Sequence, residues 1–272
     1  MVWAVFISLF ISLLKKVLGQ RLVSVIGLKV KAVAKSLSLS SDANLLKFFT
    51  LKKQIYVADK FATALFVDFL SEKRFKNAFN ESYKGLQQDD FLSSDLERIA
   101  QIEWRAHIVC WAANKVRDLE GDFVDCGVWK GVLPKTICEY IDFKSLPKTY
   151  YLVDPWGQGL KSEVYTKDIF DEVRNRFSKY PNVKLIRGLV PDALKLITTT
   201  KVAYLAIDMN GSKPERAALE YFYPRIVSGG VIYLDDYGWN YPELRATVDD
   251  FFADKPESLL HFPNGTAIVV KH

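Results

Sequence analysis

The stretch GDFVDCGVWKG at residues 121–131 decides the predicted fold of this 272-residue chain. Its first half is mainly apolar, which is typical of a strand buried in a sheet. Gly127 and Gly131 then allow a sharp turn, and residues 132–140 follow as a helix. A strand, a glycine turn and a helix form the opening unit of a nucleotide-binding α/β sheet. A tight turn that binds no ligand would use the same two glycines.

This turn also has features of a ligand site. Gly131 lets a ligand approach the N–H groups at the helix start, where positive partial charge gathers. Asp125 places a carboxylate at the strand tip, which suits a ligand carrying both a cation and a carboxylate. The spacing Asp-x-Gly-x-x-x-Gly differs from the G-x-G-x-x-G spacing of dinucleotide sites. An NAD-dependent oxidoreductase would share the sheet but would need tighter glycine spacing.

Strands and helices alternate after this unit. Strands are predicted at residues 149–154, 183–186, 202–208 and 230–235, and helices at 165–180, 191–197, 214–226 and 242–253. Such alternation predicts a parallel sheet with helices on both faces. Two last strands, 259–262 and 267–271, surround Asn264-Gly265, which is a hairpin signal. We therefore expect an α/β fold whose Rossmann-like sheet is mostly parallel and ends in an antiparallel hairpin.

The residues before this sheet are predicted to be a helical extension. Residues 1–90 form the extension, and residues 91–272 form the main domain. The apolar pattern of residues 44–86 indicates helices that serve as a cap or as a dimer contact. A further helix begins at the capping-box sequence Ser94-Asp95-Leu96-Glu97 and leads to the first strand.

Residues 1–41 are both apolar and basic. They contain six cations and no acid, which leaves a charge of −1 on the rest of a chain whose net charge is +5. The cations are Lys15, Lys16, Arg21, Lys29, Lys31 and Lys35. The apolar run 2–14 is shorter than the roughly 20 residues that cross a membrane. The segment is therefore read as a helix packing on the domain or a partner subunit, as a peripheral anchor at the inner membrane face, or as a membrane span.

Composition limits the compartment, the metal sites and the binding partners that can be expected. The three cysteines lie in apolar patterns without disulfide or metal spacing, so a reduced, cytoplasmic protein is expected. With three histidines in the whole chain, a histidine metal cluster is not expected. The nearly neutral main domain has no basic patch, so nucleic acid is not an expected partner.

Acidic residues gather at the predicted carboxyl ends of the strands. Asp154, Asp208 and the pair Asp235-Asp236 end three strands, and Asp125 lies near the tip of the first. Ligands of open α/β sheets bind at this edge. Asp154 takes the place of an acid that holds ribose hydroxyls, although it could instead cap a helix. The acids at 208, 235 and 236 offer the hard oxygen ligands that suit Mg²⁺, with an ordinary polar turn as the alternative for the pair.

Several segments in the same order resemble the macrocin O-methyltransferase family of class I, S-adenosylmethionine-dependent sugar methyltransferases. They are VDCGVWKG at 124–131, LVDPWGQG at 152–159, IRGLVPDAL at 186–194, LAID at 205–208, YPRIVSGGVIYLDDYG at 223–238 and FPNGTAIVVK at 262–271. The resemblance covers residues 121–271. The residues before about 100 resemble nothing that we can place.

The resemblance implies a donor site and a metal site. S-adenosylmethionine is expected at Asp125, Gly127, Trp129, Gly131, Asp154, Gly188 and Leu189. Mg²⁺ is expected at Asp208, Asp235 and Asp236, with Asp208 as the catalytic residue that receives the acceptor's proton. The chain departs from the family at Asn210, where a second carboxylate usually follows Asp208.

The expected activity is Mg²⁺-assisted O-methylation of a sugar hydroxyl in a glycan, glycolipid or glycosylated metabolite. The sugar-containing acceptor is the expected partner, and a homo-oligomer stays open. The alternatives are an O-methyltransferase for catechols or other small molecules, and a non-catalytic membrane-associated protein that retains the fold.

Overall fold

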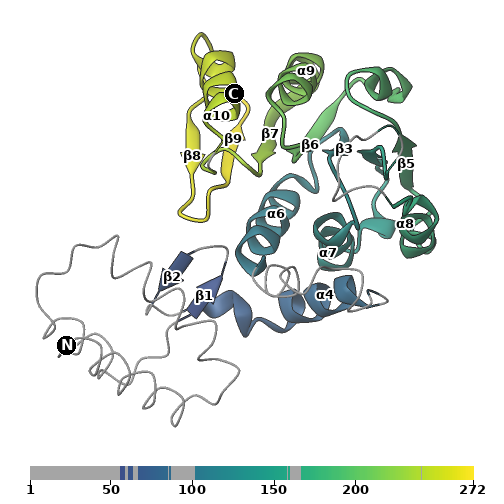
Figure 1. Cartoon of the computed structure of the whole chain (residues 1–272). Helices are drawn as coiled ribbons and strands as arrows, with labels where there is room; N and C mark the ends of the chain where they lie inside the picture. Colours follow the sequence, from purple (N-terminus) through teal and green to yellow (C-terminus); the bar gives the residue numbers. More distant parts are fainter. Residues whose placement is uncertain are drawn as a thin grey trace, which may run out of the picture. The chain divides into compact units, whose positions relative to one another are not determined.

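The computed structural model describes residues 56–58, 61–63, 67–84, 86, 102–157, 159, 167–239 and 241–272. These residues belong to one compact unit, Ile55–His272. Its centre is a seven-stranded sheet in the order β5-β4-β3-β6-β7-β9-β8, with helices on both faces (Figure 1). The predicted α/β class and Rossmann-like sheet are therefore confirmed.

The strand that opens the 121–131 stretch lies inside the parallel part of the sheet. This strand, β3 (Asp122–Cys126), pairs with β4 (Tyr150–Asp154) on one side and with β6 (Val202–Ile207) on the other. β5 (Val183–Arg187) and β7 (Ile226–Leu234) extend the parallel sheet outward. The strand order therefore reverses at β3, and open α/β sheets bind ligands beside such a reversal.

The predicted C-terminal hairpin is confirmed. β8 (Leu259–His261) and β9 (Ala267–Val270) pair antiparallel, and β9 also pairs antiparallel with β7. Gly265 in the connecting turn has a φ of 92°, a conformation that glycine adopts without strain. The Asn264-Gly265 signal therefore marks the turn correctly.

Helices cover both faces of the sheet. One face carries α6 (Glu103–Val116), α7 (Val132–Tyr140) and α8 (Phe170–Arg176), and the other carries α9 (Ser212–Phe222), α10 (Pro242–Phe252) and the 3-10 helix η4 (Asp192–Leu196). Two further 3-10 helices are η3 (Phe143–Ser145) and η5 (Tyr223–Arg225). The described part of the predicted helix 165–180 is shorter than expected. The helix begins only at Phe170 because the Asp168 side chain accepts the N–H of Phe170 at 3.0 Å, which favours a turn before the helix.

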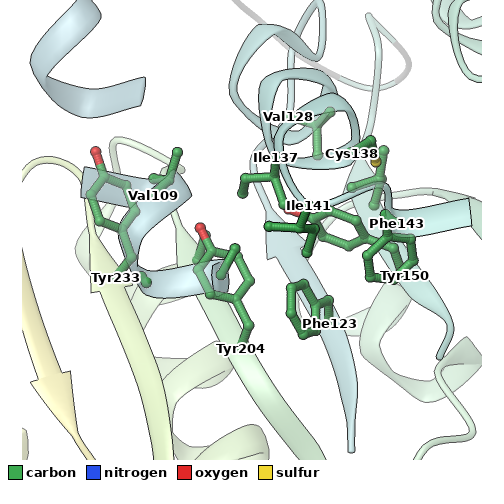
Figure 2. Packing of buried hydrophobic residues seen from close by; sticks show 14 of the residues in the cluster. Val109, Phe123, Val128, Ile137, Cys138, Ile141, Phe143, Tyr150, Tyr204 and Tyr233 are labelled. Atoms are coloured by element: carbon green, nitrogen blue, oxygen red, sulfur yellow. The ribbon is translucent and has the colours of Figure 1, made fainter. Parts of the chain in front are cut away.

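Aromatic side chains fill the core beneath α6 and α7 (Figure 2). The ring of Phe123 lies 5.2 Å from those of Phe143 and Tyr204, measured between ring centres. Successive residues of a strand face opposite sides of the sheet, so Val124 belongs to the second core under α9 and α10. Asp125 consequently shares the aromatic side with Phe123.

The structure corrects the prediction of helix throughout residues 44–86. β1 (Tyr56–Ala58) and β2 (Phe61–Thr63) pair antiparallel. Aromatic and β-branched residues favour strands, so the apolar pattern was wrongly read as a helix there. Helix is confirmed at α4 (Lys73–Tyr83), which follows the 3-10 helix η1 (Asp68–Leu70).

α4 packs on the main domain. Phe75 of α4 shares a small core with Ala106 and Cys110 of α6, and the Arg74 side chain donates to the Tyr140 carbonyl of α7 at 2.6 Å. The predicted boundary near residue 90, the capping box at 94–97 and residues 1–41 lie outside the described residues and stay predictions. In the part of the chain that the structure describes, no helix has the length and apolar character needed to cross a membrane.

Candidate active site

The two glycines after β3 are required by the geometry of the turn. Gly127 and Gly131 have φ values of 88° and 73°, which side chains disfavour. A Cβ atom at Gly127 would lie 1.7 Å from the carbonyl oxygen of Asp208, and one at Gly131 would lie 2.6 Å from the Phe177 ring. These glycines therefore lead the chain from β3 into α7 at the carboxyl edge of the sheet. We call residues 127–131 the donor turn.

Asp154, the last residue of β4, holds the donor turn in place. Its Oδ2 accepts the N–H groups of Val128 and Trp129 at 2.8 and 2.9 Å. Its Oδ1 accepts the N–H of Trp156 at 2.6 Å, and the indole of Trp156 donates to the Trp129 carbonyl at 2.8 Å. The structure thus brings the predicted donor residues Trp129 and Asp154 into direct contact.

Gly188 and Leu189 follow β5 at the same edge of the sheet. The N–H of Gly188 donates to the carbonyl oxygen of Asp154 at 3.1 Å. Leu189 is 47% exposed, which leaves an apolar surface next to this bond. The predicted donor residues of three neighbouring strands therefore meet at one place.

Asp125 lies beneath this edge. Its side chain is 4% exposed, and its Oδ1 accepts the hydroxyl of Tyr150 at 2.8 Å. Burial raises the pKa of Asp125 to about 7, although the hydrogen bond from Tyr150 acts in the opposite direction. Asp125 therefore changes charge near neutral pH, and its role as a donor ligand stays a prediction.

The three acids predicted for a metal, Asp208, Asp235 and Asp236, are close together and are called the acidic triad. One ligand oxygen of each lies within 4.8 Å of the other two. Backbone bonds join the strand tips: Asp208 donates to the Cys126 carbonyl at 2.8 Å, and Asp235 donates to the Ile207 carbonyl at 3.0 Å. The acidic triad therefore lies beside the donor turn.

Negative charge is concentrated in the acidic triad. Burial raises the pKa of Asp208 well above its usual range, the charges of Asp235 and Asp236 raise it further, and the positive charge of Arg105 partly opposes them. Carboxylates that repel one another in this way favour a cation among them, and their oxygens are the ligands that Mg²⁺ prefers.

Two side chains that sequence analysis did not identify hold Asp235. The guanidinium of Arg105 on α6 forms an ion pair with Oδ2, and the hydroxyl of Tyr233 donates to Oδ1 at 2.5 Å. Arg105 also lies over the ring of Trp239, 4.8 Å from its centre. Tyr233 could have been found, because it shares a strand face with Asp235 two residues later. No sequence signal indicated Arg105, because its partner Asp235 is distant in the sequence and is brought close only by the fold.

Glu215 is a further acid that sequence analysis missed. It lies in the first turn of α9, is 2% exposed, and its Oε1 accepts the N–H of Met209 at 3.3 Å. Burial, followed by the charge of Asp236, raises the pKa of Glu215 to about 8. Acids are common in the first turn of exposed helices, so no sequence pattern indicates that this one is buried.

The fold and this site together define a class I, S-adenosylmethionine-dependent methyltransferase. The sheet ends in an antiparallel hairpin, and the glycine turn after β3 is bonded to the acid that ends β4. The model of the macrocin-O-methyltransferase family (TylF) matches residues 96–256, more than half of the chain, and the chain belongs to this family. The protein is accordingly an S-adenosylmethionine-dependent O-methyltransferase.

Solved structures of other methyltransferases share this fold. The O-methyltransferase NovP is 22% identical, with a TM-score of 0.54 over 61% of this chain and 79% of NovP. The apo structure of CalS11, a TDP-rhamnose 3'-O-methyltransferase of calicheamicin biosynthesis, is 15% identical, with a TM-score of 0.51 over 73% of this chain and 93% of CalS11. At these identities the likeness shows the fold alone. No curated protein sequence matches the chain significantly.

Proposed function

We propose that this enzyme methylates a sugar hydroxyl of a glycan, glycolipid or glycosylated metabolite, with Mg²⁺ held by the acidic triad. The observation that carries the proposal is the contact between the donor turn and the acidic triad. The α-carbon of Gly127 lies against the carbonyl of Asp208, and the Asp208 N–H is bonded to Cys126. Residues suited to the donor and residues suited to the acceptor thus share one edge of the sheet.

We assign the methyl donor to the residues around the donor turn. The N–H groups at the start of α7 suit the donor's carboxylate, because a helix N-terminus carries positive partial charge. Asp154 Oδ2 already accepts two N–H groups, whereas Oδ1 accepts only one from the described residues. A carboxylate offers about four acceptor positions, so Oδ1 retains one for a ribose hydroxyl. The exposed side chain of Leu189 suits the apolar face of adenine.

The acidic triad fits Mg²⁺ by its chemistry. Three carboxylates within reach of one another supply hard oxygen ligands without sulfur or nitrogen. When bound, Mg²⁺ acts as a Lewis acid that lowers the pKa of a hydroxyl. Arg105 and Tyr233 each donate to one oxygen of Asp235 and thereby fix the orientation of its carboxylate.

Asp208 is the residue that we assign to receive the acceptor's proton. It is partly exposed, whereas Asp235 and Asp236 are 1% and 5% exposed. A partly exposed carboxylate at this edge of the sheet can be reached by the acceptor's hydroxyl, which is the first requirement of a general base. The proton would move to a carboxylate oxygen of Asp208 as the hydroxyl oxygen bonds to the donor's methyl carbon. The bond between that carbon and the sulfonium sulfur would break, and its electron pair would stay on the sulfur of S-adenosylhomocysteine.

A sugar is the acceptor class that the family relationship favours. Membership of the macrocin-O-methyltransferase family and the activity in the name of CalS11 both point to sugar hydroxyls. These relationships support a class of acceptor, and Asn210 marks a difference from the usual family sequence at this edge.

A panel of acceptors tests the proposal. The full-length protein is incubated with S-adenosylmethionine and Mg²⁺, together with nucleotide sugars, glycolipids, glycosylated metabolites or catechols, and products are identified by mass spectrometry. We expect methylated sugars with equimolar S-adenosylhomocysteine, and no product with Asp208→Asn. Methylation of catechols alone would show that the acceptor class is wrong.

We further propose that residues 1–41 hold the enzyme at an anionic membrane surface, where a glycolipid acceptor would be available. The support is the sequence itself, which combines six cations, no acid and the apolar run 2–14. An apolar segment and a basic segment are the two signals that stable peripheral binding requires.

A further inference from the structure

The loop after β6 is the place where this chain departs from its family. Asn210 stands where a second carboxylate usually follows Asp208, and its side chain is exposed. Its φ of 53° lies in the left-handed region, which asparagine tolerates better than most residues. The loop at residues 208–211 therefore needs support from elsewhere to hold Asp208 in place.

The buried side chain of Glu215, on α9, lies against this loop. Glu215 Oε1 accepts the N–H of Met209 at 3.3 Å, and the N–H of Gly211 donates to the same carboxylate. The Glu215 N–H in turn donates to the Gly211 carbonyl at 3.1 Å. N–H groups on both sides of Asn210 thus point to one buried carboxyl group, an arrangement that otherwise binds external anions.

The other side of the loop is held by the donor turn. The carbonyl oxygen of Asp208 lies against the α-carbon of Gly127 in the donor turn. The N–H of Asp208 donates to the carbonyl of Cys126, the residue just before the donor turn, at 2.8 Å. The loop is therefore held on one side by the hydrogen bond to Glu215 and on the other by the contact with the donor turn.

We propose that Glu215 is a positioning residue, whose carboxylate holds the 208–211 loop by accepting the Met209 N–H and so places Asp208 in the acidic triad. This inference rests on the proposed function, because it assigns a role in the metal site of that function. Glu215 acts through Asp208. The reach of its side chain to the Met209 N–H carries the role, rather than its charge.

Two variants separate reach from charge. Glu215→Gln keeps the length and an acceptor oxygen but loses the charge, whereas Glu215→Asp keeps the charge but is shorter by one methylene. Glu220→Gln, at an exposed position of the same helix that pairs with Arg216, is the matched control. Mn²⁺ affinity is measured by electron paramagnetic resonance on the full-length proteins, and S-adenosylhomocysteine affinity by calorimetry.

We expect E215D to weaken Mn²⁺ binding by about 10- to 100-fold, the usual effect of losing an outer-shell partner. E215Q should keep most of the affinity, and all variants should bind S-adenosylhomocysteine like the parent. A loss in E215Q larger than that in E215D would overturn the inference, because charge would then matter more than reach. Parental Mn²⁺ affinity in E215D, with a lower Tm, would also overturn it and leave Glu215 a purely structural role. A parent protein that does not bind Mn²⁺ would instead refute the metal part of the proposed function, and the inference with it.

Discussion

The α-carbon of Gly127 lies against the carbonyl oxygen of Asp208, so closely that a Cβ at Gly127 would come within 1.7 Å of that oxygen. Gly127 begins the donor turn, and Asp208 belongs to the acidic triad. One main-chain contact therefore joins the two halves of the proposed site. Because backbone atoms cannot move aside as a flexible side chain can, this contact fixes the distance between β3 and β6 at their tips.

Replacing Gly127 by alanine should disrupt both halves together. We expect Gly127→Ala to lose more than the roughly 1–2 kcal/mol that a left-handed residue costs, since the loop at Asp208 must also shift. Gly229→Ala is the control, because Gly229 has a φ of 80° but would meet only the side chain of Leu119, at 3.3 Å. Urea unfolding and calorimetry with S-adenosylhomocysteine measure the two effects. Equal stability losses in both variants would show that the Gly127 contact is unimportant.

Asp154 has two roles that different variants separate. Asp154→Ala removes the acceptor of three N–H groups, so it should loosen the donor turn and weaken S-adenosylhomocysteine binding by roughly 1–3 kcal/mol. Asp154→Asn keeps one oxygen for Val128 and Trp129 but loses the acceptor of the Trp156 N–H and of a ribose hydroxyl, so the fold should survive while donor binding weakens. Calorimetry and thermal unfolding are measured on both variants. Unchanged donor affinity in both would remove Asp154 from the donor site.

Asp125 should make the stability of the protein depend on pH. Its pKa rises from 3.8 in the unfolded chain to about 7 in the folded protein, so the folded state binds the proton more tightly. Its contribution to the free energy of unfolding is therefore complete below pH 3.8. It falls by about 1.4 kcal/mol per pH unit as the pH rises toward 7.

Asp125→Asn should lack this part of the pH dependence and should be more stable than the parent above pH 7. Tyr150→Phe is the complementary variant. It removes a hydrogen bond that favours the charged carboxylate, so the decline should extend to higher pH. Urea unfolding across the pH range measures all three proteins. Parallel stability curves for the parent and Asp125→Asn would mean that Asp125 does not titrate in this range.

The membrane proposal predicts binding that depends on lipid charge and on salt. Full-length protein should sediment with anionic vesicles, remain in solution with neutral ones, and dissociate as salt rises. The variant K29Q/K31Q/K35Q should lose about 3 kcal/mol of binding, at about 1 kcal/mol for each lysine. The control K144Q/K195Q/K201Q, in the main domain, should bind like the parent. If the parent protein sediments with neither kind of vesicle, the membrane proposal is wrong, and residues 1–41 pack on the domain or contact a partner subunit.

Much of the fold could be predicted because local pattern and tertiary structure agree. The helix at 132–140 was predicted with its observed bounds, since Gly131 marks its start and apolar residues continue through it. The acidic triad was predicted because parallel strands end at the same edge of a sheet. The strands at 56–58 and 61–63 were predicted as helix, because a few apolar residues in a row suit either structure.

The residues that sequence analysis missed depend on contacts between distant elements. Arg105 reaches Asp235 from a helix that the sequence marked only as packing. Glu215 is distinguished from an exposed helix acid only by its burial against the 208–211 loop. Asp154 was predicted to hold a ribose, and its bonds to the donor turn became visible only in three dimensions.

The most direct test of the proposed mechanism is the metal dependence of methyl transfer. Turnover of the full-length protein with a sugar acceptor that it methylates is measured before EDTA treatment, after EDTA treatment, and after Mg²⁺ is added back. S-adenosylhomocysteine affinity is followed in parallel, and Asp236→Asn is compared with the parent. We expect EDTA and Asp236→Asn each to abolish turnover while donor affinity stays the same, and Mg²⁺ to restore activity to the parent alone. Full turnover in excess EDTA would contradict the assignment of a metal to the acidic triad.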